Sequence, residues 1–199
     1  MTTKPALRIY YLDKRKILSE NNNHKEFIDL EIESRFLMMR EYRACDTVLL
    51  YMARPFEIST DGILYAALAN GKRVAIPRWY DDGSMQFFYV ETAADLSVGR
   101  FGIREPAPSC DRVSDYRRCV CVCPALCCDM TGRRLGFGGG YYDRFLCGFD
   151  GFSVSLCYAD SVIPTLPADE YDRPTDAVVT NHYTRYQKEN HDERRKEYL

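Results

Sequence analysis

The sequence predicts the α/β fold class: a single domain of three layers, α/β/α, with helices on both faces of a largely parallel central sheet. The length of 199 residues and a hydrophobic share of 46% suit one globular domain with a substantial core. Short apolar runs of strand length alternate with segments of helical pattern, which is typical of Rossmann-like βαβ units with parallel strands. No internal repeat, low-complexity block or linker divides the chain.

The first element is a helix expected over residues 2–19, with Pro5 in its first turn, where a missing N–H is tolerated. Its basic residues Lys4, Arg8 and Arg15 have a spacing that places them on one stripe. Such a stripe is either a solvated face or a row of cations directed at phosphates. The spacing alone does not decide between these two interpretations.

The remaining elements follow in chain order. Further helices are expected over residues 24–43, 61–70 and 141–147, and strands over residues 47–52, 73–77, 86–90, 119–123, 153–158 and 176–180. Thr60 and Asp61 can cap the helix that Gly71 ends. We therefore expect one domain over residues 1–181, followed by a polar tail over residues 182–199 that is helical or disordered.

The charge balance excludes proteins that bind polyanions through bulk charge. Lys and Arg number 27 against 29 Asp and Glu, a formal net charge of −2, so any phosphate site must be local. No apolar run reaches the roughly 18 residues of a membrane span. The first residues lack the apolar core of a signal peptide, so a cytoplasmic protein is expected.

The nine cysteines are expected to be reduced and structural. Their number is odd, and no export signal accompanies them, which disfavours a disulfide framework. Cys119, Cys121 and Cys123 alternate with Val120 and Val122, so the three thiols share one face of a strand and pack there. No second cysteine pair at zinc-knuckle spacing indicates a metal site.

The strongest local signal is a glycine-rich segment within residues 129–140, which precedes the expected helix at residues 141–147. Glycines at 136, 138, 139 and 140 let backbone N–H groups converge without Cβ clashes, and the start of a helix adds a positive dipole end. Arg133 and Arg134 add charge, and Asp143 can hold a divalent cation. The segment predicts an anion cradle with a metal ligand beside it; the alternative is a flexible turn.

Three familiar sites are excluded for this segment. A dinucleotide fingerprint fails because Tyr141 stands at its last glycine position. A Walker A motif fails because Gly71-Lys72 has Ala66 where the upstream glycine belongs. The serine nucleophile elbow is missing as well. A phosphate loop of another family is left.

The segment Arg134-Leu135-Gly136-Phe137-Gly138-Gly139-Gly140-Tyr141-Tyr142-Asp143-Arg144-Phe145-Leu146 closely resembles the signature of the 5-formyltetrahydrofolate cyclo-ligase (5,10-methenyltetrahydrofolate synthetase) family. Further blocks are similar in the same order: Lys4-x-x-x-Arg8, Tyr51 through Glu57 to Thr60, Ile76-Pro77, residues 102–106, residues 123–129, Leu166-Pro167, Asp172 and residues 176–180. The sequence departs from the family pattern at Cys127, Cys128, Ser161 and Tyr171.

The resemblance implies the reaction of ATP with 5-formyltetrahydrofolate to give 5,10-methenyltetrahydrofolate, ADP and phosphate, with Mg²⁺. It places ATP on Lys4, Arg8, Arg134, Leu135, Gly136, Phe137, Gly138, Gly139, Gly140, Tyr141 and Tyr142, and Mg²⁺ on Asp143 and Asp176. It places the folate on Met52, Glu57, Phe137, Gly138, Gly139, Gly140 and Tyr141, with Trp79 a further candidate for a flat wall. Arg134, Tyr141 and Asp143 would be catalytic.

The implied partner is a small molecule, the folate in its monoglutamate or polyglutamate form, bound by a monomer without nucleic acid or membrane. Two other functions stay open. The departures at Ser161 and Tyr171 would suit a non-catalytic or differently specific ATP-binding relative. A nucleic-acid-binding module is the second, and the net charge of −2 argues against it.

Overall fold

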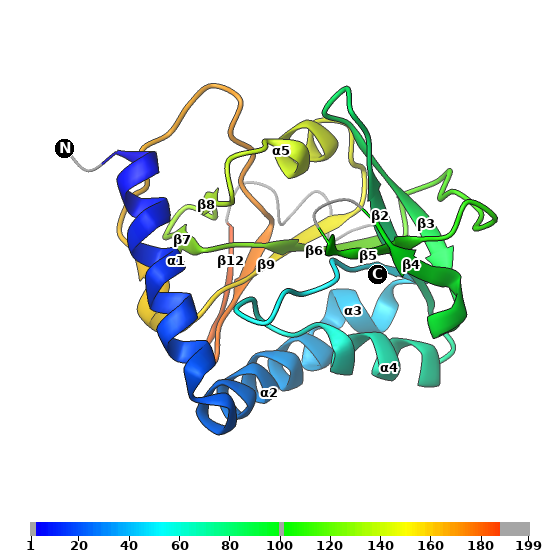
Figure 1. Cartoon of the computed structure of the whole chain (residues 1–199), viewed down its shortest axis with the longest axis horizontal. Coiled ribbons are helices and arrows are strands. Elements are labelled where there is room, and N and C mark those ends of the chain that lie inside the picture. Colours follow the sequence, from blue (N-terminus) through cyan, green and yellow to red (C-terminus); the bar gives the residue numbers. More distant parts are fainter. Residues whose placement is uncertain (1–2, 100–101, 188–199) are drawn as a thin grey trace.

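A computed structural model describes residues 3–99 and 102–187. Its centre is a seven-stranded sheet in the order β12-β11-β9-β6-β1-β2-β3 (Figure 1). The strands are β1 (Thr47–Leu49), β2 (Arg73–Trp79), β3 (Met85–Val90), β6 (Cys119–Pro124), β9 (Phe152–Leu156), β11 (Ala177–Val179) and β12 (Thr184–Tyr186). The inner five run parallel, and the edge strands β3 and β12 pair antiparallel with their neighbours. The predicted, largely parallel sheet is confirmed.

Helices cover both faces of this sheet and complete the predicted three layers. They are α1 (Lys4–Glu20), α2 (Asn22–Met38), α3 (Arg40–Ala44), α4 (Asp61–Ala69) and α5 (Tyr141–Leu146). In Figure 1, α2, α3 and α4 lie below the sheet, α5 lies above it, and α1 stands beside its left end. Ile32 of α2 and Ile63 of α4 belong to the core on one face, whereas Tyr142 of α5 belongs to the core on the other.

Short elements that the sequence did not predict complete the chain. A three-stranded sheet consists of β7 (Cys127–Asp129), β8 (Arg134–Leu135) and β10 (Val162–Ile163), and a two-stranded sheet of β4 (Leu96–Val98) and β5 (Arg104–Pro106). The 3₁₀ turns Ala93–Asp95 and Ala159–Ser161 directly precede β4 and β10. Strands of two or three residues are too short to show an alternating pattern, so sequence periodicity passes over them.

Two predicted elements are wrong in extent. The single helix expected over residues 24–43 is broken at Met39, whose backbone is extended (φ −60°, ψ 140°) and whose side chain is buried. The apolar pattern continues across the break because α2 and α3 both pack on the same face of the sheet. The strand expected over residues 47–52 ends at Leu49. Leu50 still donates to the Ala75 carbonyl at 2.9 Å, and residues 50–52 stay buried, but they belong to no strand.

The start of the expected polar tail forms a strand instead of a helix or a disordered segment. Residues 184–186, predicted as helix or disorder, form β12, which pairs antiparallel with β11. The rest of that tail, residues 188–199, lies outside the described residues, as does Thr2 of the first expected helix. None of the helices in residues 3–99 and 102–187 combines the length and apolarity needed to cross a membrane.

All nine cysteines are free thiols, and seven of them are buried. Cys110 is half-buried and Cys147 is exposed, so the expected structural packing holds for the buried seven. Cys119, Cys121 and Cys123 of β6 pack in the core under α5, whereas Val120 and Val122 pack in the core on the opposite face. The thiols act here as small apolar side chains.

Candidate active site

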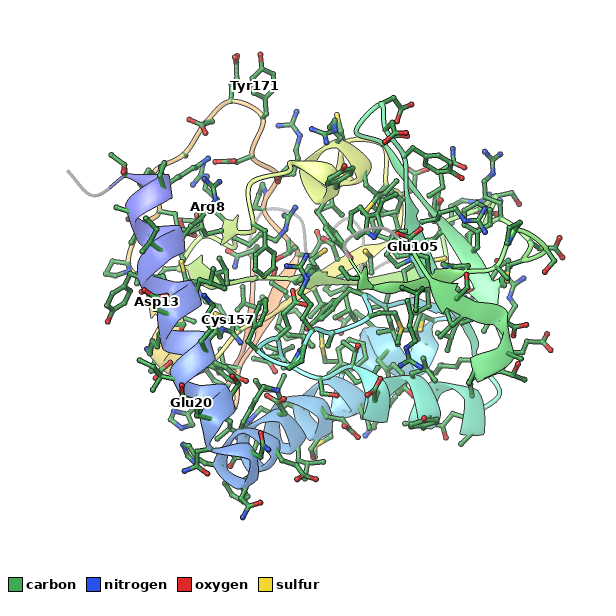
Figure 2. The ribbon with its side chains drawn as sticks, viewed as in Figure 1. Arg8, Asp13, Glu20, Glu105, Cys157 and Tyr171 are labelled. Atoms are coloured by element: carbon green, nitrogen blue, oxygen red, sulfur yellow. The ribbon has the colours of Figure 1, made fainter. Side chains whose placement is uncertain are left out.

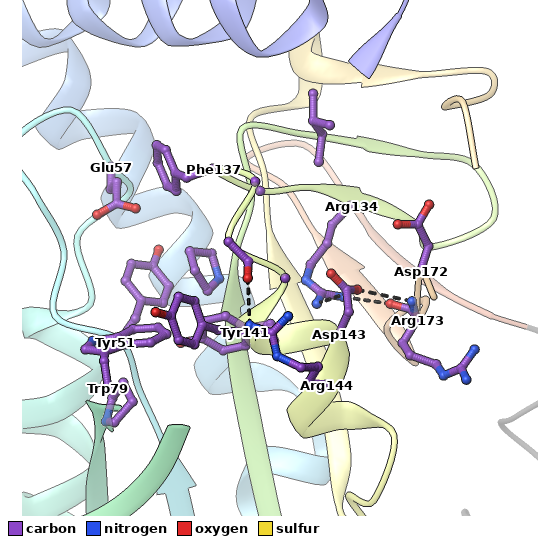
Figure 3. A pocket seen from close by; sticks show the side chains of 18 of the residues that line it. Tyr51, Glu57, Trp79, Arg134, Phe137, Tyr141, Asp143, Arg144, Asp172 and Arg173 are labelled. Carbon is purple, nitrogen blue, oxygen red and sulfur yellow. Dashed lines mark hydrogen bonds and ion pairs between the residues drawn. The ribbon is translucent and has the colours of Figure 1, made fainter. Parts of the chain in front are cut away.

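A cavity of about 700 Å³ opens at the carboxyl ends of the inner parallel strands (Figure 3). Tyr51 and Met52 reach it just after β1, Trp79 at the end of β2, and Pro124 at the end of β6. The first turns of α1 and residues 136–140 between β8 and α5 close the other side. Ligands of parallel α/β sheets bind at this edge, where loops gather from several strands.

Residues 136–140, here called the glycine loop, have the backbone of an anion cradle. Gly138 and Gly140 have φ angles of 100° and 68°, a left-handed region that side chains rarely adopt. Within the described part of the chain, the backbone N–H groups of residues 137–140 donate to no protein acceptor. Arg8 of α1 holds the loop from outside, because its Nε donates to the Gly136 carbonyl at 3.0 Å.

Cations and carboxylates are interleaved at this end of the cavity. Lys4 Nζ lies 2.6 Å from carboxylate oxygens of both Asp169 and Asp172. Burial alone would lower the pKa of Lys4, but these two carboxylates outweigh burial and raise it above 10.5. For Asp172 the effects have the opposite sign: burial alone would raise its pKa, but the hydrogen bond from Lys4 lowers it below 3.8.

Arg134 and Asp143 form a second pair. Arg134 Nη2 lies 3.0 Å from Asp143 Oδ1, and its Nη1 donates to the Arg173 carbonyl at 2.6 Å (Figure 3). The same Asp143 oxygen accepts the Arg173 backbone N–H at 3.1 Å. The segment at Asp172 and Arg173 therefore lies directly beside Asp143. Figure 2 shows its neighbour Tyr171 at the outer tip of the loop between β10 and β11.

The other end of the cavity has flat apolar walls and a carboxylate. The rings of Trp79 and Tyr141 meet edge to face at 4.8 Å. The Arg54 guanidinium stacks 4.9 Å from the ring centre of Phe137. Glu57 stands between these walls, and its Oε2 accepts the Arg54 backbone N–H at 2.8 Å. Burial raises the pKa of Glu57 above 4.5, although that hydrogen bond and nearby cations act in the opposite direction.

Residues 53–59, which carry Glu57, are tied to the core from behind. Asp29 of α2 accepts hydrogen bonds from the Ser59 backbone N–H at 3.1 Å and from Lys25 at 2.6 Å. Its second oxygen accepts the Tyr158 hydroxyl at 2.7 Å. A buried carboxylate with three donors is well compensated, so Asp29 fixes where this loop leaves the core.

The structure brings together most of the residues expected at the site and separates Arg15, Arg133 and Asp176 from it. Arg133, expected to add charge to the cradle, instead donates from Nη1 to the Thr131 hydroxyl at 2.9 Å. The cavity is lined by Lys4, Arg8, Met52, Glu57, Trp79, Arg134 and residues 135–143. Arg15, the third cation of the basic stripe, is instead buried behind the cavity, where it donates to the Ala125 carbonyl at 2.7 Å and stacks on Tyr158. Of the basic stripe, only Lys4 and Arg8 therefore face the site.

Asp176, expected at the metal, does not line the cavity. Its buried carboxylate accepts the backbone N–H and the hydroxyl of Ser153, at 2.8 and 2.7 Å. Ser153 pairs with Cys121, in the middle of β6, whereas the cavity borders Pro124 at the end of that strand. Asp176 precedes β11 and so enters the sheet too early to reach the carboxyl edge. Asp172, four positions earlier in the loop, lies at the cavity instead.

Several charged residues of the cavity were missed. Asp169, Arg54, Arg104, Arg144 and Arg173 line the cavity, and none was assigned a role from the sequence. The short Asp-x-x-Asp spacing of Asp169 and Asp172, in a loop that returns to the sheet, is the signal that could have found the first. Cationic lining residues number seven (Lys4, Arg8, Arg54, Arg104, Arg134, Arg144 and Arg173) and acidic ones four (Glu57, Asp143, Asp169 and Asp172). The cavity is thus locally cationic in a chain of net charge −2.

Known proteins of one family are similar to this chain. The family model described as the 5-formyltetrahydrofolate cyclo-ligase family matches residues 1–181. A Schizosaccharomyces pombe protein named probable 5-formyltetrahydrofolate cyclo-ligase is 28% identical over 168 residues, which cover 76% of this chain and 82% of the relative. The 5-formyltetrahydrofolate cyclo-ligase of Escherichia coli is 30% identical over 140 residues, which cover 67% of this chain and 77% of the relative.

Solved structures agree in fold. The NMR structure of Aquifex aeolicus 5,10-methenyltetrahydrofolate synthetase has a TM-score of 0.81 and 30% identity, with 94% of each chain covered. The 5,10-methenyltetrahydrofolate synthetase of Mycoplasma pneumoniae, at 23% identity and a TM-score of 0.70, covers 88% of this chain and 97% of its own length and supports the fold alone. Since the family model spans almost the whole chain, from residue 1 to residue 181, the protein belongs to the 5-formyltetrahydrofolate cyclo-ligase family.

Proposed function

We propose that this chain converts 5-formyltetrahydrofolate to 5,10-methenyltetrahydrofolate, consuming ATP in the presence of Mg²⁺ and releasing ADP and phosphate. The observation that carries the proposal is the division of one cavity into two ends. A cationic end joins the glycine loop to Lys4 and Arg8, and an aromatic end holds the half-buried Glu57. An anionic nucleotide and a flat heterocycle can therefore meet in a single space.

The chemistry explains why both ends are needed. The formyl oxygen on N5 is a poor leaving group, and transfer of the γ-phosphoryl group from ATP to that oxygen makes it a good one. N10 of the folate then attacks the activated carbon, and phosphate departs as the ring closes. Phosphoryl transfer needs positioning and charge neutralisation rather than a protein nucleophile.

The cationic end supplies those two requirements. Lys4, Arg8 and the unpaired N–H groups of the glycine loop would hold the triphosphate. Arg134 neutralises charge beside the loop while Asp143 keeps its guanidinium in place. Binding of the nucleotide replaces the carboxylate partners that Lys4 has in the free protein.

The residues present fit a bound Mg²⁺. Asp143 and Asp172 offer carboxylate oxygens at the cationic end, which are the hard donors that Mg²⁺ prefers. Across the described residues, no group of three or more His, Cys, Asp or Glu side chains could hold a metal ion without help. We therefore assign the ion to these two carboxylates together with ATP phosphates and water, where it would neutralise phosphate charge.

The aromatic end fits the folate. The pterin ring has an edge of N–H donors that the Glu57 carboxylate can accept, and its faces can pack on Tyr141, Trp79 and Phe137. Met52 lines the same cavity. The formyl group on N5 would then point toward the glycine loop, since Tyr141 and Phe137 belong to both ends of the cavity.

The test is direct. Purified protein is mixed with 5-formyltetrahydrofolate, ATP and MgCl₂, and the methenyl product is followed by its absorbance against an enzyme-free blank. Product formation that requires both ATP and Mg²⁺ is expected. Folded protein that yields no product under these conditions would exclude the proposed reaction and favour the non-catalytic ATP-binding alternative.

A further inference from the structure

Arg144 of α5 joins two segments that lie on either side of it. Its Nη2 donates to the Gly139 carbonyl of the glycine loop at 2.7 Å (Figure 3). Its Nε and Nη2 also donate to the Gly83 carbonyl, in the turn between β2 and β3, at 2.9 and 2.7 Å. The guanidinium fits because both sides are glycine: a Cβ on Gly83 would lie 3.0 Å from Nη2, and one on Gly140 would lie 2.8 Å from Nη1.

The bond to Gly139 settles an orientation that the glycines leave open. The peptide between Gly139 and Gly140 has glycine on both sides, so it can turn over with little steric cost. In a trans peptide the N–H points opposite to the preceding carbonyl, and the described chain has no cis peptide. Holding the Gly139 carbonyl toward Arg144 therefore points the Gly140 N–H the other way. With the peptide reversed, a carbonyl oxygen would replace that donor and repel an anion.

We propose that Arg144 is a positioning residue for the nucleotide: it fixes the Gly139–Gly140 peptide so that the loop presents an N–H, not a carbonyl, to the phosphates. The inference rests on the proposed use of the glycine loop as the ATP phosphate cradle. Arg144 differs from Lys4 and Arg134, whose partners include carboxylates, because its hydrogen bonds all go to backbone carbonyls. The planar guanidinium, whose N–H groups donate to two carbonyls at once, holds the peptide in place, and its charge alone would not.

The fork and the charge can be separated by substitution. Arg144→Lys keeps the charge but has no planar fork that reaches two carbonyls at once. Arg144→Met removes both. If the peptide orientation is what matters, both variants weaken ATP binding, on the order of tenfold or more, the value of a charge-assisted hydrogen bond. If the charge acts directly on phosphate, Arg144→Lys keeps most of the affinity.

Binding can be followed without turnover. Trp79 is the single tryptophan of the chain, and its ring lies 4.8 Å from the ring of Tyr141, directly after the glycine loop. Titration of the full-length protein with ATP and MgCl₂, read by Trp79 fluorescence, gives the dissociation constant. Steady-state KM values for ATP and for the folate are measured in parallel, because a merely structural defect would raise both, whereas we expect only the ATP value to rise.

Arg78 provides the matched control. It also donates to two backbone carbonyls, Pro106 at 2.8 Å and Ala107 at 2.6 Å, and stacks on an aromatic ring, but it lies outside the cavity. Arg78→Met should lower the thermal midpoint and leave the ATP dissociation constant unchanged. Should Arg144→Met fail to fold, Arg144→Gln, with one amide donor and no charge, takes its place.

The outcomes separate clearly. Weak ATP binding in both Arg144→Met and Arg144→Lys, with normal folate KM, supports the proposal. Normal affinity in Arg144→Met, or recovery in Arg144→Lys, overturns it. A wild-type chain that binds ATP but forms no methenyl product contradicts the proposed function alone. A wild-type chain that binds no ATP contradicts both.

Discussion

Asp143 combines two roles that a single substitution can separate. Its Oδ1 accepts hydrogen bonds from the Arg134 guanidinium and from the Arg173 backbone N–H. An asparagine oxygen can accept the same bonds, so Asp143→Asn preserves the local geometry and removes only the negative charge. Asp143→Asn therefore tests the proposed metal role of Asp143 directly.

We expect Asp143→Asn to lower kcat on the order of 100-fold, with circular dichroism and thermal midpoint close to wild type, because the Mg²⁺ site loses a charged ligand. The methenyl absorbance assay at saturating MgCl₂ gives the rate. Asp111→Asn, an exposed carboxylate outside the cavity, serves as the control and should have full activity. Near-normal turnover in Asp143→Asn would remove Asp143 from the metal site.

Glu57 should give the folate KM a pH dependence. Burial raises the pKa of Glu57 above its ordinary 4.5, and the pterin donors need the carboxylate form. Folate affinity should therefore be full well above that raised pKa and be lost as the pH falls through it. Folate KM is measured between about pH 5.5 and 8 with enzyme-free blanks. Glu57→Gln should bind weakly with a flat profile; a sloping profile in that variant would assign the titration to another group.

At this scale the sequence predicted residues within continuous motifs better than residues that converge through folding. Lys4, Arg8 and Asp143 lie in motifs whose chemistry is visible locally, and all reach the cavity. Asp176 and Asp172 are four positions apart in one loop, and only the point at which β11 enters the sheet separates the structural carboxylate from the one at the cavity. That point depends on the register of β11 against β9, which cannot be determined from a single sequence.

The glycine loop is the element whose shape matters most. A Cβ on Gly139 would lie 2.8 Å from the Tyr141 ring, so a branched side chain there displaces the ring and fills the cradle. Gly139→Val should raise the KM for ATP at least tenfold, and more than the KM for the folate. Gly148→Val, just after α5, where a Cβ meets nothing within 4 Å, should be neutral in both. Equal losses of ATP and folate affinity in Gly139→Val would indicate misfolding instead.

The position of residues 53–59, and with it the affinity for the folate, should depend on Asp29. Asp29→Asn removes the charge that compensates the half-buried Lys25 ammonium and weakens the anchor of Ser59. We expect a loss of about 2–3 kcal/mol in the free energy of unfolding and a higher folate KM, while the KM for ATP stays unchanged. Urea unfolding and steady-state kinetics measure the two effects. A higher KM for ATP in this variant would contradict the assignment of the loop to the folate.

The elements themselves were predictable where a long pattern exists. The strands of the central sheet other than β12, and helices α1, α4 and α5, follow apolar runs, caps and glycine stops visible in the sequence. The break at Met39 was not predictable, since its buried side chain continues the apolar face of α2 while its backbone is extended. The short strand β7 pairs with β8 on one side and with β10 on the other, and the contact with β10 joins segments that are distant in the sequence.

For the molecule as a whole, the buried thiols set an alkaline limit on stability. Burial raises the pKa of Cys45 from 9.0 to about 11 and that of Cys127 to about 12. In the unfolded chain these thiols ionise near 9.0, whereas in the fold they stay protonated. Their contribution is therefore complete below pH 9 and is lost as the pH rises toward the folded values, by about 1.4 kcal/mol per pH unit for each thiol.

Urea unfolding at several pH values between about 8 and 10.5 measures this slope. Cys127→Ala should flatten it by the share of one thiol, whatever its effect on stability at neutral pH. Cys147→Ala, at an exposed site, should keep the wild-type slope. A slope that is the same in all three proteins would exclude Cys127 as a source of the alkaline loss.

The pairing of Lys4 with Asp172 spans 168 positions of the chain. During synthesis, α1 leaves the ribosome first and its ammonium has no native carboxylate until the last loop before β11 has emerged. A chain that stops before that loop lacks both carboxylates that face Lys4 and also the strands β11 and β12. The cationic end of the cavity is therefore completed only when the last strands of the central sheet have been made.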